Sequence, residues 1–374
     1  MANTILFGAN RGYALLSSRR KLIEHFLANG WRVVIATSDD NESKRLVELG
    51  AVLEPVTFNR GGLSPLADFW AHRRLRVIVK KWAPSLAHFF HAKPVIMGTL
   101  AIRAELGESA PVVNTITGLG RSFVQGGLVT RLASAGYRKA LPQADTTIFQ
   151  NRDDMTLFLQ NGWLRESKAK IIVGSGVPLD RFLFMDRSSR STENPVIVML
   201  GRLLKQKGIP EFVKIAGLIR VKIPDARFLL AGEDEPGHPD CVDMHWLRSI
   251  SDIEYVGRIS DVVPLLNDAD LLLFPSYYRE GVPRVVMEAA ATGLPTVAFD
   301  VPGVREAVQN EKTGFLVPRH DVEQMTTRVF ELLENSKLRL EFGRNACEFA
   351  QRAFDIRAVQ EAYLNVYRKL GVDI

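Results

Sequence analysis

Residues 274–295, FPSYYREGVPRVVMEAAATGLP, combine a turn, a helix start and two carboxylates. Pro283 suits the first helical position, where its missing N–H costs no hydrogen bond. The backbone amides that follow it can bind phosphate at the positive end of the helix dipole. Glu280 and Glu288 flank this start with seven residues between them, and ionised carboxylates bind vicinal hydroxyls well. The segment predicts a site for a phosphorylated sugar. A pair of glutamates at this spacing, taken alone, is more often a pair of solvent-exposed helix residues without a functional role.

A basic segment, MLGRLLKQKG at residues 199–208, follows an apolar run that predicts a strand. We expect Arg202 and Lys207 at the carboxyl end of this strand, where they can reach the same cleft and neutralise a diphosphate. Arginine binds phosphate oxygens as a fork, and lysine acts as a mobile point charge. The alternative is a solvated basic loop.

Parallel sheets covered by helices must position these residues, because short apolar runs alternate with amphipathic stretches along all 374 residues. At about 150 residues per domain, the length predicts two domains. One series of elements starts near residue 4 and another at residue 196, after a polar stretch at 186–195 that we interpret as a linker. The predicted fold is α/β, with two Rossmann-like doubly wound domains, 1–185 and 186–354, facing across a cleft. Ligands bind at the carboxyl ends of the strands in such sheets.

The second series has predicted strands at 196–200, 228–231, 271–274 and 296–299, and predicted helices at 210–221, 283–292 and 322–334. A final amphipathic helix is expected at 355–370. In the first series, the loop after the first strand has glycines only at Gly8 and Gly12. It therefore does not match GxGxxG, which makes a dehydrogenase a weak alternative.

Composition excludes several classes of protein. Apolar residues make up 46% and charged residues 24%, which is typical of globular proteins and not of disordered or coiled-coil chains. Cys241 and Cys347 are isolated, so we expect neither a disulfide framework nor a CxxC site. We find no signal peptide and no apolar run of the roughly 20 residues that span a bilayer, and we expect a cytoplasmic protein.

The charge is uneven. Residues 1–185 contain 24 Lys and Arg against 14 Asp and Glu, and the remaining residues contain 24 against 28. The basic half suggests a polyanionic partner, such as nucleic acid, an anionic membrane or a phosphorylated substrate, with a merely solvated basic face as the alternative.

The second half resembles the retaining glycosyltransferase family 4 of the GT-B fold. The resemblance lies in the blocks GRLLKQKG, FLLAGEDE, IEYVGRISDVVPLLNDADLLLFPS, YREGVPRVVMEAAATGLPTVA and VPGVREAVQNEKTGFLVP. It implies that Arg202 and Lys207 bind the donor diphosphate, that Glu280 contacts the hydroxyls of the transferred sugar, and that Glu288 holds the nucleotide ribose. The remaining donor-site residues it implies are Gly201, Arg258, Ile259, Gly281, Val282, Pro283, Arg284 and Val285, with Arg258 and Ile259 beside the base.

The first half resembles bacterial enzymes that extend sugars carried on polyprenyl diphosphate, through AHFFHAKPVIMG and VVNTITGLGRSF. On this acceptor side we expect Asn10, Gly12, His91 and Thr117. Thr117 stands where many relatives carry a histidine, so no imidazole is expected at that position. His91 and His88 are the alternative candidates for a catalytic histidine, although a lone histidine at a strand end is more often structural. The resemblance also implies that the helix within 355–374 packs back on the first domain.

Two acidic runs imitate functional motifs. Asp268-Ala269-Asp270 has the form of a DxD metal motif, but it leads into an apolar strand and matches a family block that binds no metal. Glu233-Asp234-Glu235 follows another predicted strand and is interpreted as a solvated turn. We expect neither a metal nor a cofactor, with the diphosphate neutralised by Arg202, Lys207 and the helix start.

The resemblance implies an α-retaining transfer of a hexose or N-acetylhexosamine from a nucleotide sugar, UDP-linked rather than GDP-linked, to a polyprenyl diphosphate-linked saccharide. The alternatives are a soluble transferase of the same family with a small acceptor and a UDP-N-acetylglucosamine 2-epimerase. Amphipathic stretches at 73–82 and 121–139 suggest contact with the anionic inner face of the cytoplasmic membrane, or else ordinary packed helices. We expect no nucleic-acid partner, because no stacking platform or known module is present.

Overall fold

The computed structural model describes residues 3–59, 64–120, 123, 126–190 and 193–374. The chain divides into two compact units. Unit 1 comprises Met1–Ser175 and Arg357–Ile374, and unit 2 comprises Gly176–Ile356. Each unit contains its own parallel sheet, which confirms the predicted α/β class for both.

The division between the units falls after Ser175, and the polar stretch at 186–195 lies inside unit 2. The interpretation of this stretch as an interdomain linker is therefore wrong. Its Arg187 is buried, and the guanidinium donates to the backbone carbonyls of Ala269, Leu266 and Thr292 at 2.7–2.8 Å. These bonds fix the stretch to unit 2, and its polar composition gave no sign of them.

The sheet of unit 1 has seven parallel strands in the order β3-β2-β1-β4-β5-β6-β7. They are β1 (Thr4–Gly8), β2 (Arg32–Thr37), β3 (Val52–Pro55), β4 (Leu86–Phe90), β5 (Val112–Ile116), β6 (Thr146–Phe149) and β7 (Ala169–Ile171). Strands β1, β4 and β5 are buried along their whole length, as expected for a parallel sheet covered on both faces.

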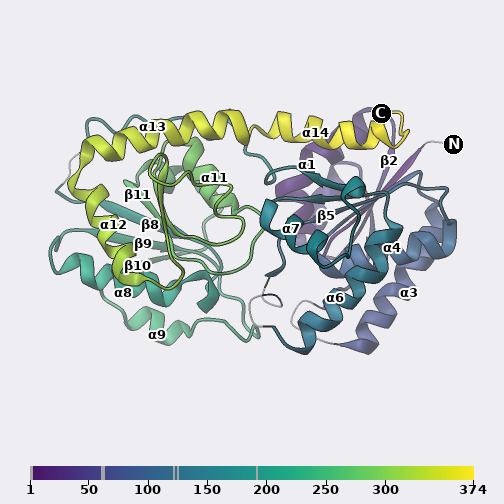
Figure 1. Ribbon diagram of the computed structural model, residues 1–374, viewed down its shortest axis with the longest axis horizontal. Helices are drawn as coiled ribbons and strands as arrows, with labels where there is room; N and C mark the ends of the chain where they lie inside the picture. Colours follow the sequence, from purple (N-terminus) through teal and green to yellow (C-terminus); the bar gives the residue numbers. More distant parts are fainter. Residues whose placement is uncertain (1–2, 60–63, 121–122, 124–125, 191–192) are drawn as a thin grey trace. The chain divides into compact units, whose positions relative to one another are not determined.

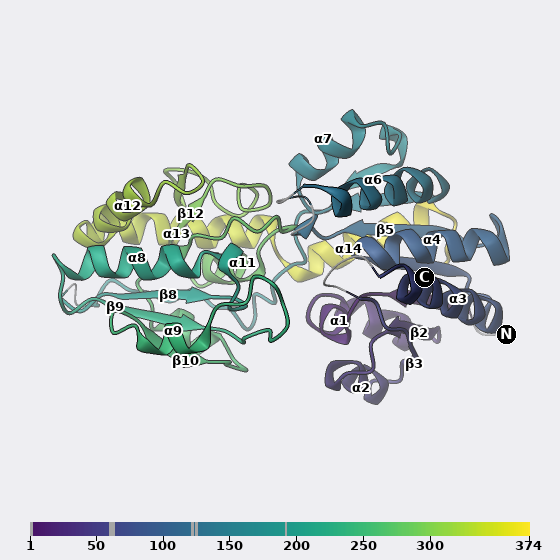
Figure 2. The same cartoon turned by 90° about the horizontal axis from the view of Figure 1, so that it is seen from below.

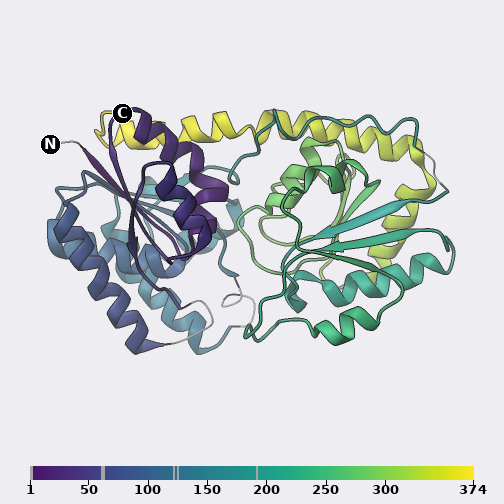
Figure 3. The same cartoon turned by 180° about the vertical axis from the view of Figure 1, so that it is seen from behind.

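Helices cover both faces of this sheet. They are α1 (Gly12–Ala28), α2 (Asn41–Glu48), α3 (Pro65–Trp82), α4 (Ala92–Leu106), α6 (Leu128–Ala140), α7 (Arg152–Gln160) and α14 (Ile356–Lys369). Successive strand residues point to opposite faces, so Leu6 packs in one core cluster with residues of α3, α4 and α6, and Phe7 packs in another with residues of α1 and α14. Figure 2 shows α3, α4 and α6 side by side, and Figure 3 shows α1, in purple, beside α14, in yellow.

Helix α14 completes the core of unit 1 although it follows unit 2 in the sequence. Tyr363 and Tyr367 are fully buried in the cluster that contains Phe7. The Tyr367 hydroxyl lies 2.6 Å from His88 Nδ1, and the guanidinium of Arg19 in α1 lies 4.8 Å from the Tyr363 ring centroid. Buried polar contacts therefore fix this helix in place as well as apolar packing.

The sheet of unit 2 has six parallel strands in the order β10-β9-β8-β11-β12-β13 (Figure 1). They are β8 (Val196–Leu200), β9 (Arg227–Ala231), β10 (Glu254–Gly257), β11 (Leu271–Phe274), β12 (Thr296–Phe299) and β13 (Gly314–Val317). The helices are η3 (Lys205–Lys207), α8 (Ile209–Arg220), α9 (Met244–Ser249), α10 (Val263–Asn267), α11 (Arg284–Ala291), α12 (Val322–Glu334) and α13 (Ser336–Ala353). Among the described residues, we find no helix with the length and apolarity needed to cross a bilayer.

Candidate active site

The strand order of unit 2 reverses between β8 and β11, so the loops that leave these neighbouring strands diverge around one point at the carboxyl edge of the sheet. The loop after β8 touches the loop after β11. A Cβ on Gly208, whose φ is +86°, would lie 2.1 Å from the carbonyl oxygen of Pro275. The amide of Tyr277 also donates to the carbonyl of Gln206 at 3.0 Å. Glycine at 208 is therefore required to bring the two loops together.

Lys207 and Glu280 meet at this point, one from each loop. The Lys207 Nζ donates to Glu280 Oε1, and the lysine is buried. Because the carboxylate is already bound to the ammonium group, an anion that approaches Lys207 competes with Glu280 for its N–H donors.

Arg202 lies on the same loop as Lys207 and pairs with a different carboxylate. Its Nη1 donates to Glu235 Oε2 at 2.6 Å. Burial lowers the pKa of Arg202, but the Tyr278 hydroxyl and the Glu235 carboxylate outweigh burial, and the net pKa is raised. The Tyr278 ring centroid lies 5.6 Å from the Arg202 guanidinium carbon and 5.2 Å from Lys207 Nζ, so one aromatic ring is close to both cations.

The interpretation of Glu233-Asp234-Glu235 as a solvated turn is wrong for Glu235, whose side chain is only 17% exposed. The turn follows β9, beside β8, and the Leu203 amide donates to the Glu233 carbonyl at 3.0 Å. Glu233 in turn accepts from Arg258 Nη1 at 3.1 Å, on the exposed loop after β10 that also carries Ile259. The acidic turn therefore binds two of the three arginines that the sequence assigned to the donor site, Arg202 and Arg258.

Helix α11 begins at Arg284, one residue later than expected, because Pro283 has ψ 121° and occupies the N-cap. Glu288 is buried within this helix and accepts a hydrogen bond from Arg284 Nε at 2.6 Å. Burial raises the pKa of Glu288, and the positive charge of Arg284 opposes that shift. Both glutamates therefore pair with a cation, and they differ in burial, since Glu288 is buried and Glu280 is partly exposed.

The remaining predicted donor residues line the same edge. Gly281, Val282 and Pro283 are buried in the loop before α11, and Val285 is in its first turn. The Gly201 amide donates to Ala231 at 3.0 Å, and a Cβ on Gly232 would lie 1.8 Å from the Gly201 carbonyl oxygen. These residues set the course of the backbone around the charged pairs.

Asp270 lies at the opposite, amino edge of the sheet. It is buried, and its Oδ2 accepts from the Val196 amide at 2.9 Å. Among the residues that the structure describes, no three His, Cys, Asp or Glu side chains are grouped to hold a metal ion.

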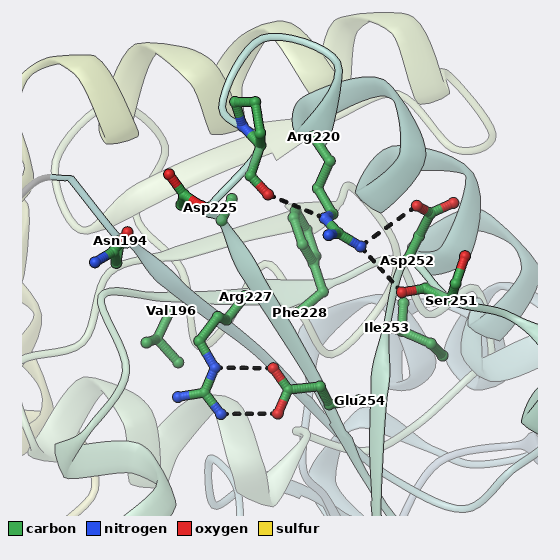
Figure 4. A pocket seen from close by; sticks show the side chains of 12 residues that line it. Asn194, Val196, Arg220, Asp225, Arg227, Phe228, Ser251, Asp252, Ile253 and Glu254 are labelled. Carbon is green, nitrogen blue, oxygen red and sulfur yellow. Dashed lines mark hydrogen bonds and ion pairs between the residues drawn. The ribbon is translucent and has the colours of Figure 1, made fainter.

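A hollow of about 560 Å³ also lies at the amino edge of unit 2, beside the starts of β8, β9 and β10 (Figure 4). Arg227 pairs with Glu254 through two hydrogen bonds of 2.7 and 2.8 Å, and Arg220 lies 3.5 Å from Asp252. None of the predicted site residues lines this hollow, and its arginines already have carboxylate partners.

The strand order in the sheet of unit 1 reverses between β1 and β4, and two of the predicted acceptor residues meet at this point. The Asn10 amide donates to His91 Nδ1 at 3.5 Å. His91 is the N-cap of α4 with a φ of 69°, which is unusual for a residue other than glycine. Burial, and then the charge of Arg19, lower the pKa of His91 to about 4, so its imidazole is neutral at physiological pH.

The other acceptor-side candidates have partners of their own. The Gly12 amide, at the start of α1, donates to Asp40 Oδ2 at 2.9 Å. Thr117 is partly buried directly after β5. His88 is fully buried, with Nε2 2.7 Å from the Thr115 hydroxyl in addition to its bond to Tyr367, so it is a structural residue. Burial holds the His88 pKa well below its usual value.

Two family models match the chain in tandem. A glycosyl transferase 4-like domain matches residues 18–173, and glycosyl transferases group 1 matches residues 180–349. The chain is a group 1 glycosyltransferase. The family that the sequence resemblance predicted is thereby confirmed.

Relatives of this glycosyltransferase match it over nearly its whole length. It is 27% identical to the N,N'-diacetylbacillosaminyl-diphospho-undecaprenol alpha-1,3-N-acetylgalactosaminyltransferase of Campylobacter jejuni, with 97% of this chain and 98% of the relative covered. Its fold matches sucrose-phosphate synthase from Thermosynechococcus elongatus with a TM-score of 0.79, at 20% identity and with 98% and 99% of the two chains covered. It also matches Anabaena HepE in complex with UDP-glucose, with a TM-score of 0.77, 19% identity and 98% and 99% coverage. These structural matches confirm the predicted pair of doubly wound domains of the GT-B fold.

Sequence reasoning did not identify three residues that contact the predicted site residues. Glu235 and Tyr278 lie beside Arg202 in unit 2, and Asp40 binds the Gly12 amide in unit 1. Glu235 was recognisable only as part of an acidic run, and Tyr278 only as an aromatic residue two positions before Glu280. Asp40 had a local signal, because Asp40 and Ser43 form a capping box at the start of α2.

Proposed function

We propose that this glycosyltransferase transfers a hexose or N-acetylhexosamine from a UDP-sugar to a polyprenyl diphosphate-linked saccharide, with retention of the α configuration. The observation that carries the proposal is the near full-length similarity to the Campylobacter jejuni enzyme, whose name specifies an undecaprenyl diphosphate-linked acceptor and an α-linked product. The UDP-glucose bound to the Anabaena protein of the same fold supports a UDP-linked donor.

In the proposed donor complex, Arg202 and Lys207 bind the diphosphate. The phosphate competes with Glu280 for Lys207, and the Glu280 carboxylate accepts hydrogen bonds from the hydroxyls of the sugar. The contacts that support this assignment are the Lys207–Glu280 pair, of which the lysine is buried, and the nearby Arg202. Glu288 holds the ribose, and the first amides of α11 add to the positive potential around the phosphates.

Cleavage of the bond between the anomeric carbon and the phosphate creates an oxocarbenium-like sugar and a diphosphate with additional negative charge. Fixed cations near the phosphate stabilise that charge, which is usually a dominant part of catalysis. The leaving phosphate accepts the proton of the attacking hydroxyl on the same face of the sugar, so the configuration is retained. No metal ion is needed in this scheme, because Arg202 and Lys207 neutralise the diphosphate.

On the acceptor side, Asn10, Gly12, His91 and Thr117 lie at or near the carboxyl edge of unit 1. A neutral His91 offers a hydrogen bond rather than a charge to the acceptor. We place the enzyme on the inner face of the cytoplasmic membrane as a peripheral protein, since its proposed acceptor is a lipid.

The test is transfer from UDP-GlcNAc, UDP-GalNAc, UDP-glucose and GDP-mannose to a synthetic polyprenyl diphosphate-linked saccharide, with NMR assignment of the anomeric linkage. We expect an α-linked product from a UDP-sugar, and unchanged transfer after EDTA treatment. Glu280→Gln is expected to abolish transfer, whereas Glu254→Gln, in a surface ion pair at the opposite edge of the same sheet, is expected to retain it. Complete epimerisation of the donor without any acceptor would show a different enzyme class.

A further inference from the structure

Helices α3 and α6 begin with large apolar side chains that lie in solvent. Leu66, Phe69 and Trp70 in the first two turns of α3 are each more than half exposed. Leu128 and Leu132 at the start of α6 are exposed to a similar degree. Burying such side chains is favourable, so their concentration on two helix starts points to a surface that is covered in use.

These two helix starts lie at the same end of one helical layer. Helix α3 packs against α4, and α4 packs against α6. In Figures 1 and 2 the first turns of α3 and α6 are directed to the same side of unit 1. We call the exposed side chains at these two helix starts the helix-start patch and define it as Leu66, Phe69, Trp70, Arg73, Leu128, Arg131 and Leu132.

The charge of the patch is positive. Arg73 and Arg131 are exposed, and within the described part of the chain neither has a carboxylate partner. The one acidic residue near the start of α3, Asp68, is neutralised by Lys93 at 2.6 Å. Helix α6 has no acidic residue at all.

The rest of α3, within the stretch at 73–82 for which the sequence suggested either membrane contact or ordinary packing, does not share this character. Arg74 and Lys81 pair with Glu54 at 2.6 Å each, and Arg76 and Lys80 lie 2.5 and 3.6 Å from Glu105. These four cations are therefore paired with carboxylates of unit 1. Arg121, in the other stretch that the sequence indicated, lies outside the described residues.

We propose that the helix-start patch docks unit 1 on a bilayer that contains anionic phospholipid. Aromatic and leucine side chains enter the boundary between headgroups and acyl chains, and Arg73 and Arg131 contact the anionic headgroups. Each cation near such a surface contributes about 1 kcal/mol, which corresponds to about fivefold in the partition coefficient. The proposal deepens the proposed function, since a polyprenyl-linked acceptor lies in the same membrane.

The test is sedimentation of the full chain with vesicles of phosphatidylcholine, with and without phosphatidylglycerol. We expect binding to the phosphatidylglycerol vesicles, at least tenfold weaker for Phe69→Ser/Trp70→Ser. The matched control is Val77→Ser, which replaces another exposed apolar residue of α3 and is expected to bind like the wild type. Thermal unfolding of each variant verifies that it is folded.

The charge contribution is tested with Arg73→Ala/Arg131→Ala, for which we expect roughly 25-fold weaker binding to phosphatidylglycerol vesicles, about fivefold for each cation, and little change without that lipid. Lys80→Ala/Arg138→Ala removes two cations from the same helices outside the patch and is expected to have a smaller effect. Equal effects of the two double variants would overturn the assignment of the patch.

Two other results would overturn the proposal. One is wild-type protein that does not bind phosphatidylglycerol vesicles. The other is a dimer in analytical ultracentrifugation that Phe69→Ser/Trp70→Ser dissociates, because a second copy of the chain would then cover the patch. Vesicle binding needs no substrate, so normal binding by a protein without transferase activity would contradict the proposed function and leave the patch assignment intact.

Discussion

Replacement of Glu235 by glutamine is predicted to tighten the binding of UDP. In the ligand-free protein Glu235 Oε2 accepts a hydrogen bond from Arg202 Nη1 at 2.6 Å, and the proposed donor diphosphate competes with this carboxylate for the guanidinium. Glutamine keeps the shape of the side chain and removes the competing charge. Neighbouring Lys207 keeps its own partner, Glu280, in this variant.

The size of the effect follows from the exposure of the pair. The Arg202 side chain is 36% exposed and that of Glu235 is 17% exposed, so solvent screens part of the attraction. Ion pairs at such sites are worth about 0.2–1 kcal/mol, and the release of the upper value corresponds to about a fivefold lower Kd. In the proposed donor complex, Arg202→Gln removes a charged hydrogen bond to the phosphate, worth about 1.5–3 kcal/mol, and is expected to raise the Kd at least tenfold.

Isothermal titration calorimetry with UDP at several salt concentrations measures both changes. The gain in Glu235→Gln is expected to shrink as the salt concentration rises, because the competing charge is partly exposed. The matched control is Glu233→Gln, whose partner Arg258 is on the exposed loop after β10, and it is expected to change the Kd less. Weaker UDP binding by Glu235→Gln would refute the reasoning, since Glu235 would then position Arg202 for the donor instead of competing with it.

Three further predictions concern unit 1. The pKa of His91 in the folded protein is about 4, against an ordinary value of 6.5, so the contribution of this neutral side chain to stability is complete above pH 6.5 and is lost as the pH falls toward 4. In urea unfolding, His91→Gln is therefore expected to lose less stability in acid than the wild type, by up to about 3 kcal/mol at pH 4. The same pH dependence in both proteins would contradict the shifted pKa. Gly12→Ala would place its Cβ 2.3 Å from Asp40 Oδ1, and denaturant unfolding is expected to show a loss of about 1–3 kcal/mol in the free energy of unfolding. An unchanged unfolding midpoint would show that α2 can move to make room for the methyl group. Tyr367→Phe leaves His88 Nδ1 without its buried partner, and denaturant unfolding is expected to show a loss of about 1–3 kcal/mol, with wild-type stability arguing against this bond.

Much of the fold could be predicted because the central strands carry continuous apolar runs. Strands β8, β11 and β12 begin and end where the sequence predicted. The edge strands β3 (VLEP) and β7 (AKI) were missed, since they are short and have no apolar run or clear alternation. Edge strands contribute only one side to the hydrogen-bond ladder, so their sequences are less constrained.

The site was less predictable than the fold. Lys207 and Glu280 were assigned to one cleft, and the structure brings them into contact. The pairing of Arg202 with Glu235 was missed, because it depends on the order of β8 and β9 in the sheet and on backbone bonds between their loops. The strained backbone of His91 also gave no signal, because residues before a helix start rarely have a positive φ unless they are glycine.

The return of α14 to unit 1 has a consequence for the order in which the protein acquires its structure during synthesis. Phe7, Phe26 and Trp31 share a core cluster with Tyr363 and Tyr367, which leave the ribosome only after all of unit 2 has been made. Unit 2 is continuous in the sequence and can become native first. Unit 1 has to wait with an uncovered apolar face, so nascent chains that stop before residue 356 are expected to bind chaperones through the amino-terminal unit.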